Sequence, residues 1–412
     1  MLKFINHTLS NGLKLIIIPD TSTPLVQVNV LYKVGARNEH PDRTGFAHLF
    51  EHLMFGGSAN IPDYDRPLQL AGGENNAFTN NDITNYYISL PPENLDIALW
   101  LESDRMNELA FTPKSLETQR QVVIEEFRQR NLNQPYGDAF MNLRDLAYKK
   151  HPYSWSTIGK CIEHIKDASM EDVKDFFYKH YAPNNAILSI AGNVDPVRVY
   201  ERVKHWFGDI PKRNISAAII PEEPVQTKPR TLTLERDVPF SGLYMAYHMS
   251  DRLNPKYYAS DLISDILSNG KSSWFEQILI KEKQIFSSVD AYILGSYDPG
   301  LFVISGKLHK DKTYEEAEHA INELTSRITN GDFSKTELEK VKNRSIALRQ
   351  LSLSSVENKA FETAFFEFLG DAGLINEEDK KYMNVSSEDI IFTAKEIFNT
   401  NNCSTLYYKS KK

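Results

Sequence analysis

The pattern of apolar residues predicts an amphipathic helix shortly before residue 55. Four large apolar side chains recur there at helical spacing: Phe46, Leu49, Phe50 and Leu53. Asp42 or Thr44 offers an N-cap before this run, and Gly56-Gly57 offers a stop after it. We therefore expect one side of this helix to pack into a core and the other side to carry the polar residues.

A second amphipathic helix is predicted from Ser115 to Arg130, a segment without glycine or proline. Ser115 offers an N-cap at its start. Leu116, Val123 and Phe127 fall on one side of this helix when successive residues are placed 100° apart. This side is expected to be buried.

Strand-like segments repeat once along the chain at offsets of 214, 216 and 217 residues. The matching pairs are Val28–Tyr32 with Gly242–Ala246, Tyr86–Ser89 with Phe302–Ser305, and Ile187–Ile190 with Ser404–Tyr407. The near-constant offset predicts duplicated domains. Each half mixes strands with long helices, so we expect an α+β layered fold in each. We place the first domain at 1–215, a proline-rich linker at 216–230 and the second domain at 231–412.

Composition and charge narrow the classes of function. A chain of 412 residues with 41% hydrophobic residues can form two or more domains with sizeable cores. Its net charge of −8 is not gathered in blocks, which argues against nucleic-acid binding. Cys161 and Cys403 give no disulfide framework. We see no secretion signal and no transmembrane span, and so expect a cytoplasmic protein without membrane contact, leaving a periplasmic location open.

The polar side of the first helix carries candidate metal chemistry. His48 and His52 lie four residues apart and share one helix face, with Glu51 one turn after His48. Neutral imidazoles suit zinc, and a carboxylate beside a zinc-bound water can take its proton. The order H-x-x-E-H is that of inverzincin peptidases. These residues predict a catalytic zinc site with Glu51 as the general base.

A catalytic zinc ion usually has three protein ligands, so one more is needed. Glu125 and Glu126 in the second helix are the candidates. Glu126 lies about 80° from the centre of the apolar stripe, whereas Glu125 points nearly opposite. Because the ligand must sit beside the buried side, we choose Glu126 and expect Glu125 to be a solvated carboxylate. His48, His52 and Glu126 would then hold one Zn²⁺ per chain.

Further motifs carry a resemblance to a known family. They are Gly45–His52, Gly72–Thr79, Val122–Glu126, His151-Pro152-Tyr153 and Tyr181–Asn185. With these motifs the sequence resembles, over nearly its whole length, the pitrilysin and mitochondrial-processing-peptidase family of zinc metallopeptidases, particularly its small two-domain bacterial members. The resemblance implies two homologous domains, each a mostly antiparallel sheet packed with helices, that enclose a cavity. In that family the distal zinc ligand is the second Glu of such a pair, in agreement with Glu126.

The resemblance also implies how a substrate binds. In the family the segment that corresponds to Asn75–Thr79 is an edge strand, to which an extended peptide adds as a further strand. Asn76, Ala77 and Phe78 would then contact the peptide. On the residues alone, an ordinary hairpin is the alternative. The function implied is that of a zinc-dependent endopeptidase acting on peptides or small unfolded proteins.

Two departures from the family pattern bear on activity. Self-contained members carry an Arg and a Tyr seven residues apart where this chain has Ile280 and Ser287, which cannot donate in the same way. In some relatives the active site is divided between two subunits, one that holds the zinc and a homologous partner that holds the Arg/Tyr pair. The chain resembles the zinc-bearing half, which implies a heterodimer, with a homodimer as the alternative. Gln119 replaces a Glu that is usual in the family, which bears on the surroundings of the metal.

Other functions stay open at this point. A non-catalytic subunit of a larger assembly is one, although such members usually lose part of the metal set that is complete here. A zinc hydrolase of other substrates would use the same motif. The helix expected at Asp251–Leu267 of the second half carries no metal ligands, and we interpret Asp261 and Asp265 as a solvated pair.

Overall fold

The computed structural model of the protein describes residues 1–215 and 218–411. These residues pack into two compact units, each discontinuous in sequence. Unit 1 comprises Met1–Arg128, Trp155–Pro221 and Gln350–Glu377, and unit 2 comprises Gln129–Ser154, Glu222–Arg349 and Glu378–Lys412. The first half of the sequence therefore forms most of unit 1 but contributes 129–154 to unit 2, and the second half forms most of unit 2 but contributes 350–377 to unit 1.

The units differ from the domains predicted at 1–215 and 231–412. Segments 129–154 and 350–377 lie in one half of the sequence and pack in the unit of the other half. A packing unit and a duplicated sequence domain are different divisions of a chain, so the boundaries of the duplicated domains stay a prediction. Residues 216–217, the first two of the predicted linker, lie outside the described residues.

Unit 1 is built on a mixed, mostly antiparallel sheet. Its described strands have the order β1-β2-β6-β3-β5-β4, in which only β2 and β6 run parallel. The strands are β1 (Ile5–Thr8), β2 (Lys14–Pro19), β3 (Val26–Tyr32), β4 (Glu74–Thr79), β5 (Thr84–Leu90) and β6 (Ala186–Gly192). The central strands β3 and β6 are buried along their whole length, as expected where both faces of a sheet are covered. This order leaves β4 at one edge.

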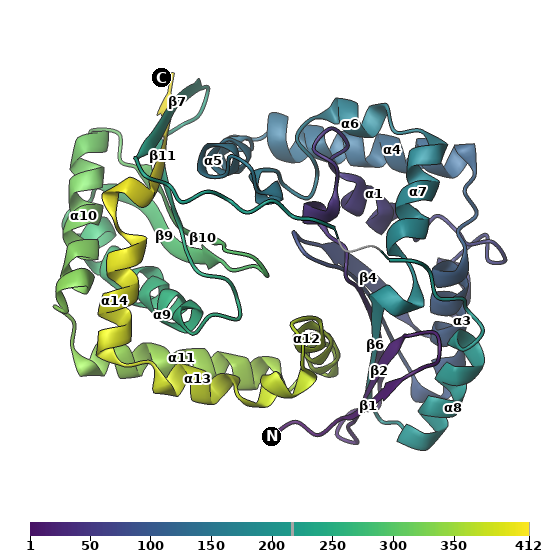
Figure 1. Ribbon diagram of the computed structural model, residues 1–412. Helices are drawn as coiled ribbons and strands as arrows, with labels where there is room; N and C mark the ends of the chain where they lie inside the picture. Colours follow the sequence, from purple (N-terminus) through teal and green to yellow (C-terminus); the bar gives the residue numbers. More distant parts are fainter. Residues whose placement is uncertain (216–217, 412) are drawn as a thin grey trace. The chain divides into compact units, whose positions relative to one another are not determined.

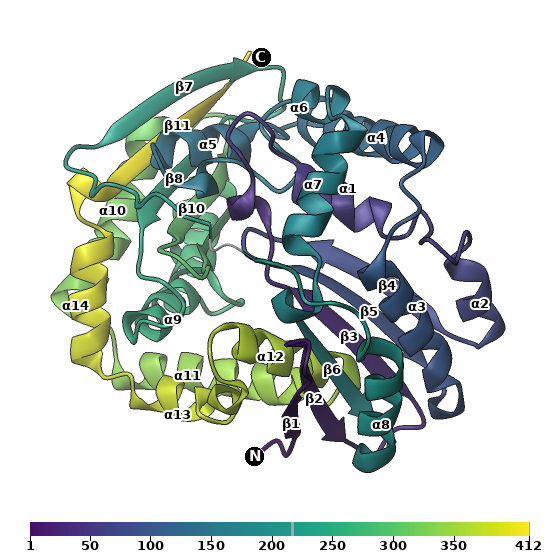
Figure 2. The same ribbon diagram turned by 45° about the vertical axis from the view of Figure 1, so that its right-hand side comes forward.

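Helices cover both faces of the unit 1 sheet. On one face α12 (Val356–Phe368) lies against β3 and β6 (Figure 1), with Ala360 and Ala364 packed into an apolar cluster that includes Ile187. On the other face α3 (Leu95–Asn107) contacts β3 and α8 (Pro196–Phe207) contacts β2 (Figure 2). The remaining α-helices described in this unit are α1 (Phe46–Leu53), α2 (Asp65–Leu70), α4 (Pro113–Phe127), α6 (Ile162–Lys166) and α7 (Met170–His180).

Unit 2 repeats this arrangement of strands. Its order β7-β11-β8-β10-β9 corresponds to β2-β6-β3-β5-β4, again with one parallel pair, β7 and β11. The strands are β7 (Arg230–Arg236), β8 (Gly242–His248), β9 (Phe286–Leu294), β10 (Leu301–Leu308) and β11 (Cys403–Ser410). The segments matched in the sequence fall in β3 and β8, β5 and β10, and β6 and β11. The predicted α+β fold with two similar, mostly antiparallel sheets is therefore confirmed.

The helices of unit 2 also lie on both faces of their sheet. One face carries α5 (Ala139–Ala147), whose Leu143 and Ala147 pack against β8 and β11. The other face packs against α9 (Lys256–Ser268), α10 (Tyr314–Asn330) and α14 (Ser387–Ile397). Further helices in this half of the chain are α11 (Lys335–Ser352) and α13 (Glu378–Asn384). No helix in the described parts of either unit has the length and apolar character needed to cross a membrane.

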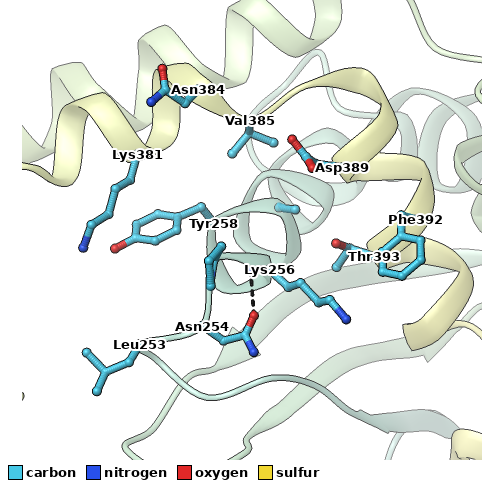
Figure 3. A pocket seen from close by; sticks show the side chains of 12 residues that line it. Leu253, Asn254, Lys256, Tyr258, Lys381, Asn384, Val385, Asp389, Phe392 and Thr393 are labelled. Atoms are coloured by element: carbon cyan, nitrogen blue, oxygen red, sulfur yellow. Dashed lines mark hydrogen bonds between the residues drawn. The ribbon is translucent and has the colours of Figure 1, made fainter.

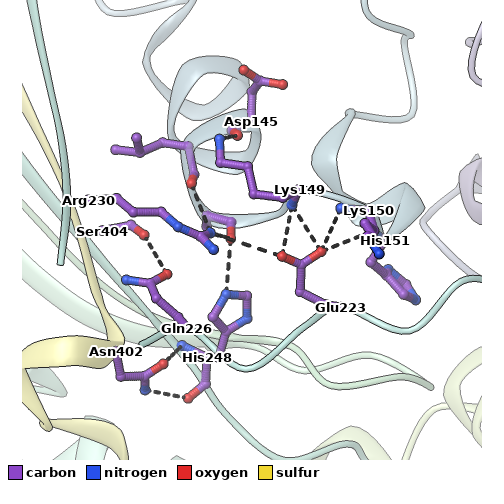
Figure 4. Close-up of polar contacts among 12 residues, drawn as sticks. Asp145, Lys149, Lys150, His151, Glu223, Gln226, Arg230, His248, Asn402 and Ser404 are labelled. Atoms are coloured by element: carbon purple, nitrogen blue, oxygen red, sulfur yellow. Dashed lines mark hydrogen bonds and ion pairs between the residues drawn. The ribbon is translucent and has the colours of Figure 1, made fainter. Parts of the chain in front are cut away.

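The carboxylate of Glu223 binds the backbone that follows α5 in unit 2 (Figure 4). Glu223 accepts the backbone N–H groups of Lys149 and Lys150, each at 2.8 Å, and of His151 at 3.0 Å. The guanidinium of Arg230 lies 4.0 Å from the same carboxylate. Burial alone would raise the pKa of Glu223, but the three N–H donors outweigh it and hold this pKa below its ordinary value.

Replacing this carboxylate is expected to weaken unit 2. Glu223→Gln should lower the free energy of unfolding by roughly 1–3 kcal/mol near neutral pH, because charge-assisted hydrogen bonds are lost. The lowered pKa means that Glu223 stabilises the protein above its ordinary pKa of 4.5 and loses this effect as the pH falls further. Urea unfolding should show the difference from wild type shrinking below that pH. The exposed neighbour Glu222 gives the control variant, Glu222→Gln. Equal stability of both variants would contradict the assignment.

Candidate metal centre

Helix α1 begins directly after a glycine turn. Gly45 is its N-cap, with a φ of 89°, a left-handed conformation that favours glycine. A Cβ atom at Gly45 would also lie 2.8 Å from the carbonyl oxygen of Ile158. Asp42 or Thr44 was expected as the N-cap, and this expectation is wrong.

The side chain of Glu39 caps the helix instead, from outside its first turn. Its carboxylate accepts the N–H groups of Gly45 at 2.9 Å and Ala47 at 2.8 Å, and the Nε1–H of Trp155 at 3.0 Å. Burial raises the pKa of Glu39 to about 8, although these donors act in the opposite direction. This role of Glu39 was not predicted from the sequence, because a capping side chain six residues before the N-cap forms no standard pattern. The available signal was an acidic residue shortly before a helix start.

The apolar side of α1 packs as predicted. Its four stripe residues are all buried: Phe46, Leu49, Phe50 and Leu53. The ring of Phe50 stacks on those of Phe176 and Tyr181, with 5.0 and 5.2 Å between ring centroids. This packing fixes the rotation of the helix about its axis, and therefore the direction in which the side chains of His48 and His52 project.

Helix α4 begins two residues before its predicted start. Its first residue is Pro113 and its N-cap is Thr112, whose hydroxyl accepts the N–H of Ser115 at 3.0 Å. The prediction of Ser115 as N-cap is therefore wrong. The predicted buried side is confirmed by three buried residues: Leu116, Val123 and Phe127.

Helices α1 and α4 bring three metal-binding side chains together. One ligand atom from each of His48, His52 and Glu126 lies within 4.8 Å of the others. Oε2 of Glu126 is 3.6 Å from Nε2 of His48 and 3.4 Å from Nε2 of His52. A tetrahedral zinc ion with bonds of about 2.0–2.1 Å holds its ligand atoms about 3.4 Å apart. The donor set and the two distances from Glu126 to the histidines therefore fit a zinc ion.

The two adjacent glutamates of α4 point in different directions. The side chain of Glu126 is 17% exposed beside the histidines, whereas that of Glu125 is 55% exposed and pairs with Arg128. Glu126, the glutamate favoured by the helical phase of α4, is thus the one that joins the cluster. The His48 side chain is 10% exposed and that of His52 is 25% exposed, so the cluster is partly buried but open to solvent.

Glu51 extends from the same side of α1 and meets the end of strand β4. The hydroxyl of Thr79, the last residue of β4, donates a hydrogen bond to Oε2 of Glu51 at 2.6 Å. Thr79 belongs to the motif Gly72–Thr79, but no role was predicted for it. The signal available in the sequence is strand alternation, because the neighbour of Phe78 in a strand points to the opposite face of the sheet, here toward α1.

The predicted edge position of β4 is confirmed, since β5 is its neighbour in the described sheet. Within it, the N–H of Ala77 donates to Oδ1 of Asn76 at 2.8 Å. The Phe78 ring contacts Phe361 of α12 edge-on, with 5.2 Å between ring centroids. Phe78 therefore lies on the sheet face opposite Thr79. Peptide binding by Asn76, Ala77 and Phe78 stays a prediction.

Helix α9 in unit 2 occupies the place of α1 in the repeat but holds a different polar set. It begins at Lys256, after the N-cap Pro255, so the predicted start at Asp251 is wrong. Within the described residues, the metal-binding cluster above has no counterpart there. Tyr382 donates to Asp261 at 2.6 Å and Ser345 donates to Asp265 at 3.0 Å. Burial raises the pKa of Asp261 to about 6. The interpretation of these aspartates as a solvated pair is wrong, because α11 and α13 cover this face of the helix.

The residues that depart from the family pattern have structural surroundings of their own. Ile280 is partly buried against the apolar core of unit 2. Ser287 lies in β9 and donates to the carbonyl of Lys307 at 3.1 Å. Gln119 is partly buried on α4, seven residues before Glu126 and so on the same helix face.

Unit 2 also contains a cavity of about 650 Å³ beside the first turn of α9 (Figure 3). Its apolar walls include Val385 and Phe392, and its cations are Lys256 and Lys381. Both lysines have carboxylate partners, Glu396 at 2.8 Å and Glu378 at 3.3 Å. None of the candidate site residues lines this cavity.

Comparisons with known proteins agree with the geometry. The family model described as insulinase (peptidase family M16) matches residues 14–160, and that of the peptidase M16 inactive domain matches residues 167–345. The zinc protease PqqE of Helicobacter pylori is 30% identical over 98% of this chain and 92% of the relative. The mitochondrial-processing peptidase subunit beta of Saccharomyces cerevisiae is 30% identical over 50% of this chain and 44% of the relative.

The solved structures agree as well. The crystal structure of a protease from Helicobacter pylori superposes with a TM-score of 0.93 at 29% identity, covering 99% of this chain and 100% of the other. Both family models, a relative similar over nearly its whole length, and the cluster of two histidines and a glutamate therefore agree. The chain belongs to the insulinase family of zinc proteases, peptidase family M16.

Proposed function

We propose that the protein is a zinc-dependent endopeptidase that hydrolyses peptides or small unfolded proteins bound as extended strands. The observation that carries this proposal is the spacing of His48, His52 and Glu126, with 3.4 and 3.6 Å between the carboxylate oxygen and the two imidazole nitrogens. These residues would hold one Zn²⁺ per chain. Zinc, when bound, supplies Lewis acidity toward water and a carbonyl oxygen.

Glu51 is the general base in this proposal. It lies between the two histidines on the same helix side, so its carboxylate can reach a water next to the cluster. An ionised carboxylate accepts the proton of that water as the water attacks the peptide carbonyl carbon. The same carboxyl group then donates this proton to the leaving amine nitrogen. The hydroxyl of Thr79 donates a hydrogen bond to Oε2 of this carboxylate at 2.6 Å.

Strand β4 provides the proposed binding edge for the substrate. An extended peptide that pairs with β4 would accept the N–H of Ala77, displacing the Oδ1 of Asn76 that now accepts it. The displaced Asn76 amide is then available to the peptide backbone. Recognition through the main chain predicts low selectivity for the side chains of the substrate.

We further propose that full activity needs a homologous partner subunit. The Arg/Tyr pair of self-contained relatives is replaced by Ile280, which packs into a core, and by Ser287, whose hydroxyl binds a backbone carbonyl. Neither side chain can stabilise a developing oxyanion as a guanidinium and a phenol can. A partner with an intact pair would supply these donors. The similarity to a peptidase with a named beta subunit supports this proposal.

The isolated chain is accordingly expected to cleave peptides poorly. Steady-state cleavage of an unfolded protein or a quenched-fluorescence peptide is measured first with the isolated protein and then with a homologous subunit that keeps the Arg/Tyr pair. Addition should raise kcat/KM by about 100-fold or more, because an oxyanion donor is worth that much. Mixtures made with Glu51→Gln are the control and should stay inactive. Full activity from a verified monomer or homodimer would exclude the partner requirement while leaving the peptidase assignment intact.

A further inference from the structure

Thr79 connects the binding edge to the catalytic helix. It is the last residue of β4, paired with Thr84 of β5, and its hydroxyl donates to Oε2 of Glu51 at 2.6 Å. A glutamate side chain has three rotatable bonds, so a hydrogen bond from a donor on a strand restricts the positions that its carboxylate can take. Threonine suits this task because its branched Cβ restricts χ1.

The backbone around Thr79 is held rigidly. In the turn after β4, Oδ1 of Asn80 accepts the N–H groups of Asp82 at 2.8 Å and Ile83 at 2.9 Å. The carbonyl of Asn80 accepts the N–H of Ala36 at 3.1 Å. Thr84 is fully buried and its hydroxyl donates to the Val34 carbonyl at 2.9 Å. Thr79 therefore extends its hydroxyl from a frame with little freedom to move.

We propose that Thr79 is a positioning residue, which holds the carboxylate of Glu51 in its reactive orientation and ties it to the strand that binds the substrate. This inference rests on the proposed function for its catalytic consequence. A substrate paired with β4 is placed relative to the backbone of Thr79, and Glu51 is placed relative to its hydroxyl. One short structural element therefore sets the position of both the scissile carbonyl and the base, to the precision of a fraction of an ångström that proton transfer requires.

Two substitutions separate the hydroxyl from the shape of the side chain. Thr79→Val keeps the branched shape and removes the donor, whereas Thr79→Ser keeps the donor. With the active enzyme, Thr79→Val is expected to lower kcat by about 10-fold or more at nearly unchanged KM and zinc content, because the base is misplaced. Thr79→Ser should recover most of kcat. Thr118→Val, at an exposed position of α4, is the matched control.

Crystal structures of the variants test the inference independently of activity. The Glu51 carboxylate is expected in the same position in wild type and Thr79→Ser, and displaced from that position in Thr79→Val. An unchanged position of the Glu51 carboxylate in Thr79→Val would overturn the inference, whether or not the protein cleaves peptides. Wild-type kcat in Thr79→Val, or a loss confined to KM or zinc content, would overturn it as well. Loss of the proposed function would instead appear as a wild-type protein that cleaves no peptide with any partner.

Discussion

Glu51→Gln is expected to retain about one zinc per chain and to lose peptide hydrolysis by several hundred-fold or more, as for removal of a general base. Glutamine has the shape of glutamate, and its amide oxygen can still accept the hydroxyl of Thr79. An amide does not take up a proton near neutral pH, so the attacking water keeps its proton. The three residues of the metal cluster, His48, His52 and Glu126, are untouched by this change.

Turnover and zinc content are measured on the same preparations of wild type and variant, with the partner subunit present. Glu171→Gln, at an exposed position of α7, controls for loss of a carboxylate in unit 1. Similar kcat values for wild type and Glu51→Gln would refute the role of Glu51 as base. Loss of zinc from Glu51→Gln would show that Glu51 supports the metal cluster instead.

Local periodicity was sufficient to predict the two helices that carry the candidate metal cluster. An apolar stripe fixes which side of a helix is buried, and the positions of His48, His52 and Glu126 on the remaining surface follow from 100° per residue. The structure brings these three side chains together, and it turns Glu125 outward, because the burial of Val123 and Phe127 sets the rotation of α4.

Features that depend on distant contacts could not be read from local patterns. Segment 129–154 packs in unit 2 and segment 350–377 packs in unit 1. The pattern of apolar residues within each strand and helix is the same whichever unit the segment joins, so this pattern cannot predict the assignment. Glu39 caps α1 through space, and Asp261 is covered by Tyr382, which lies 121 residues later. Charged residues at helical spacing are predicted to be exposed to solvent unless the helices that pack over them are known. These misses therefore concern long-range packing, whereas the helix and strand types were correct.

Glu126→Gln is expected to lower zinc affinity by about 100-fold or more, since loss of even an outer partner of a metal ligand costs 10–100-fold. The Oε2 of Glu126 lies 3.4 and 3.6 Å from the two imidazole nitrogens, so this carboxylate completes the three-ligand set and carries its negative charge. A neutral amide oxygen binds zinc far more weakly. Elemental analysis after removal of loosely bound metal gives the measurement.

Glu125→Gln is the matched control, because it makes the same substitution one residue earlier on the same helix. Its carboxylate is 55% exposed and pairs with Arg128, so the variant should keep about one zinc per chain. The pair of variants separates the loss of a ligand from the loss of a negative charge on α4, since only the position differs. If Glu125→Gln lost zinc while Glu126→Gln kept it, the cluster would not be the metal site. Equal loss from both would mean that the charge of α4, rather than coordination by one carboxylate, controls zinc binding.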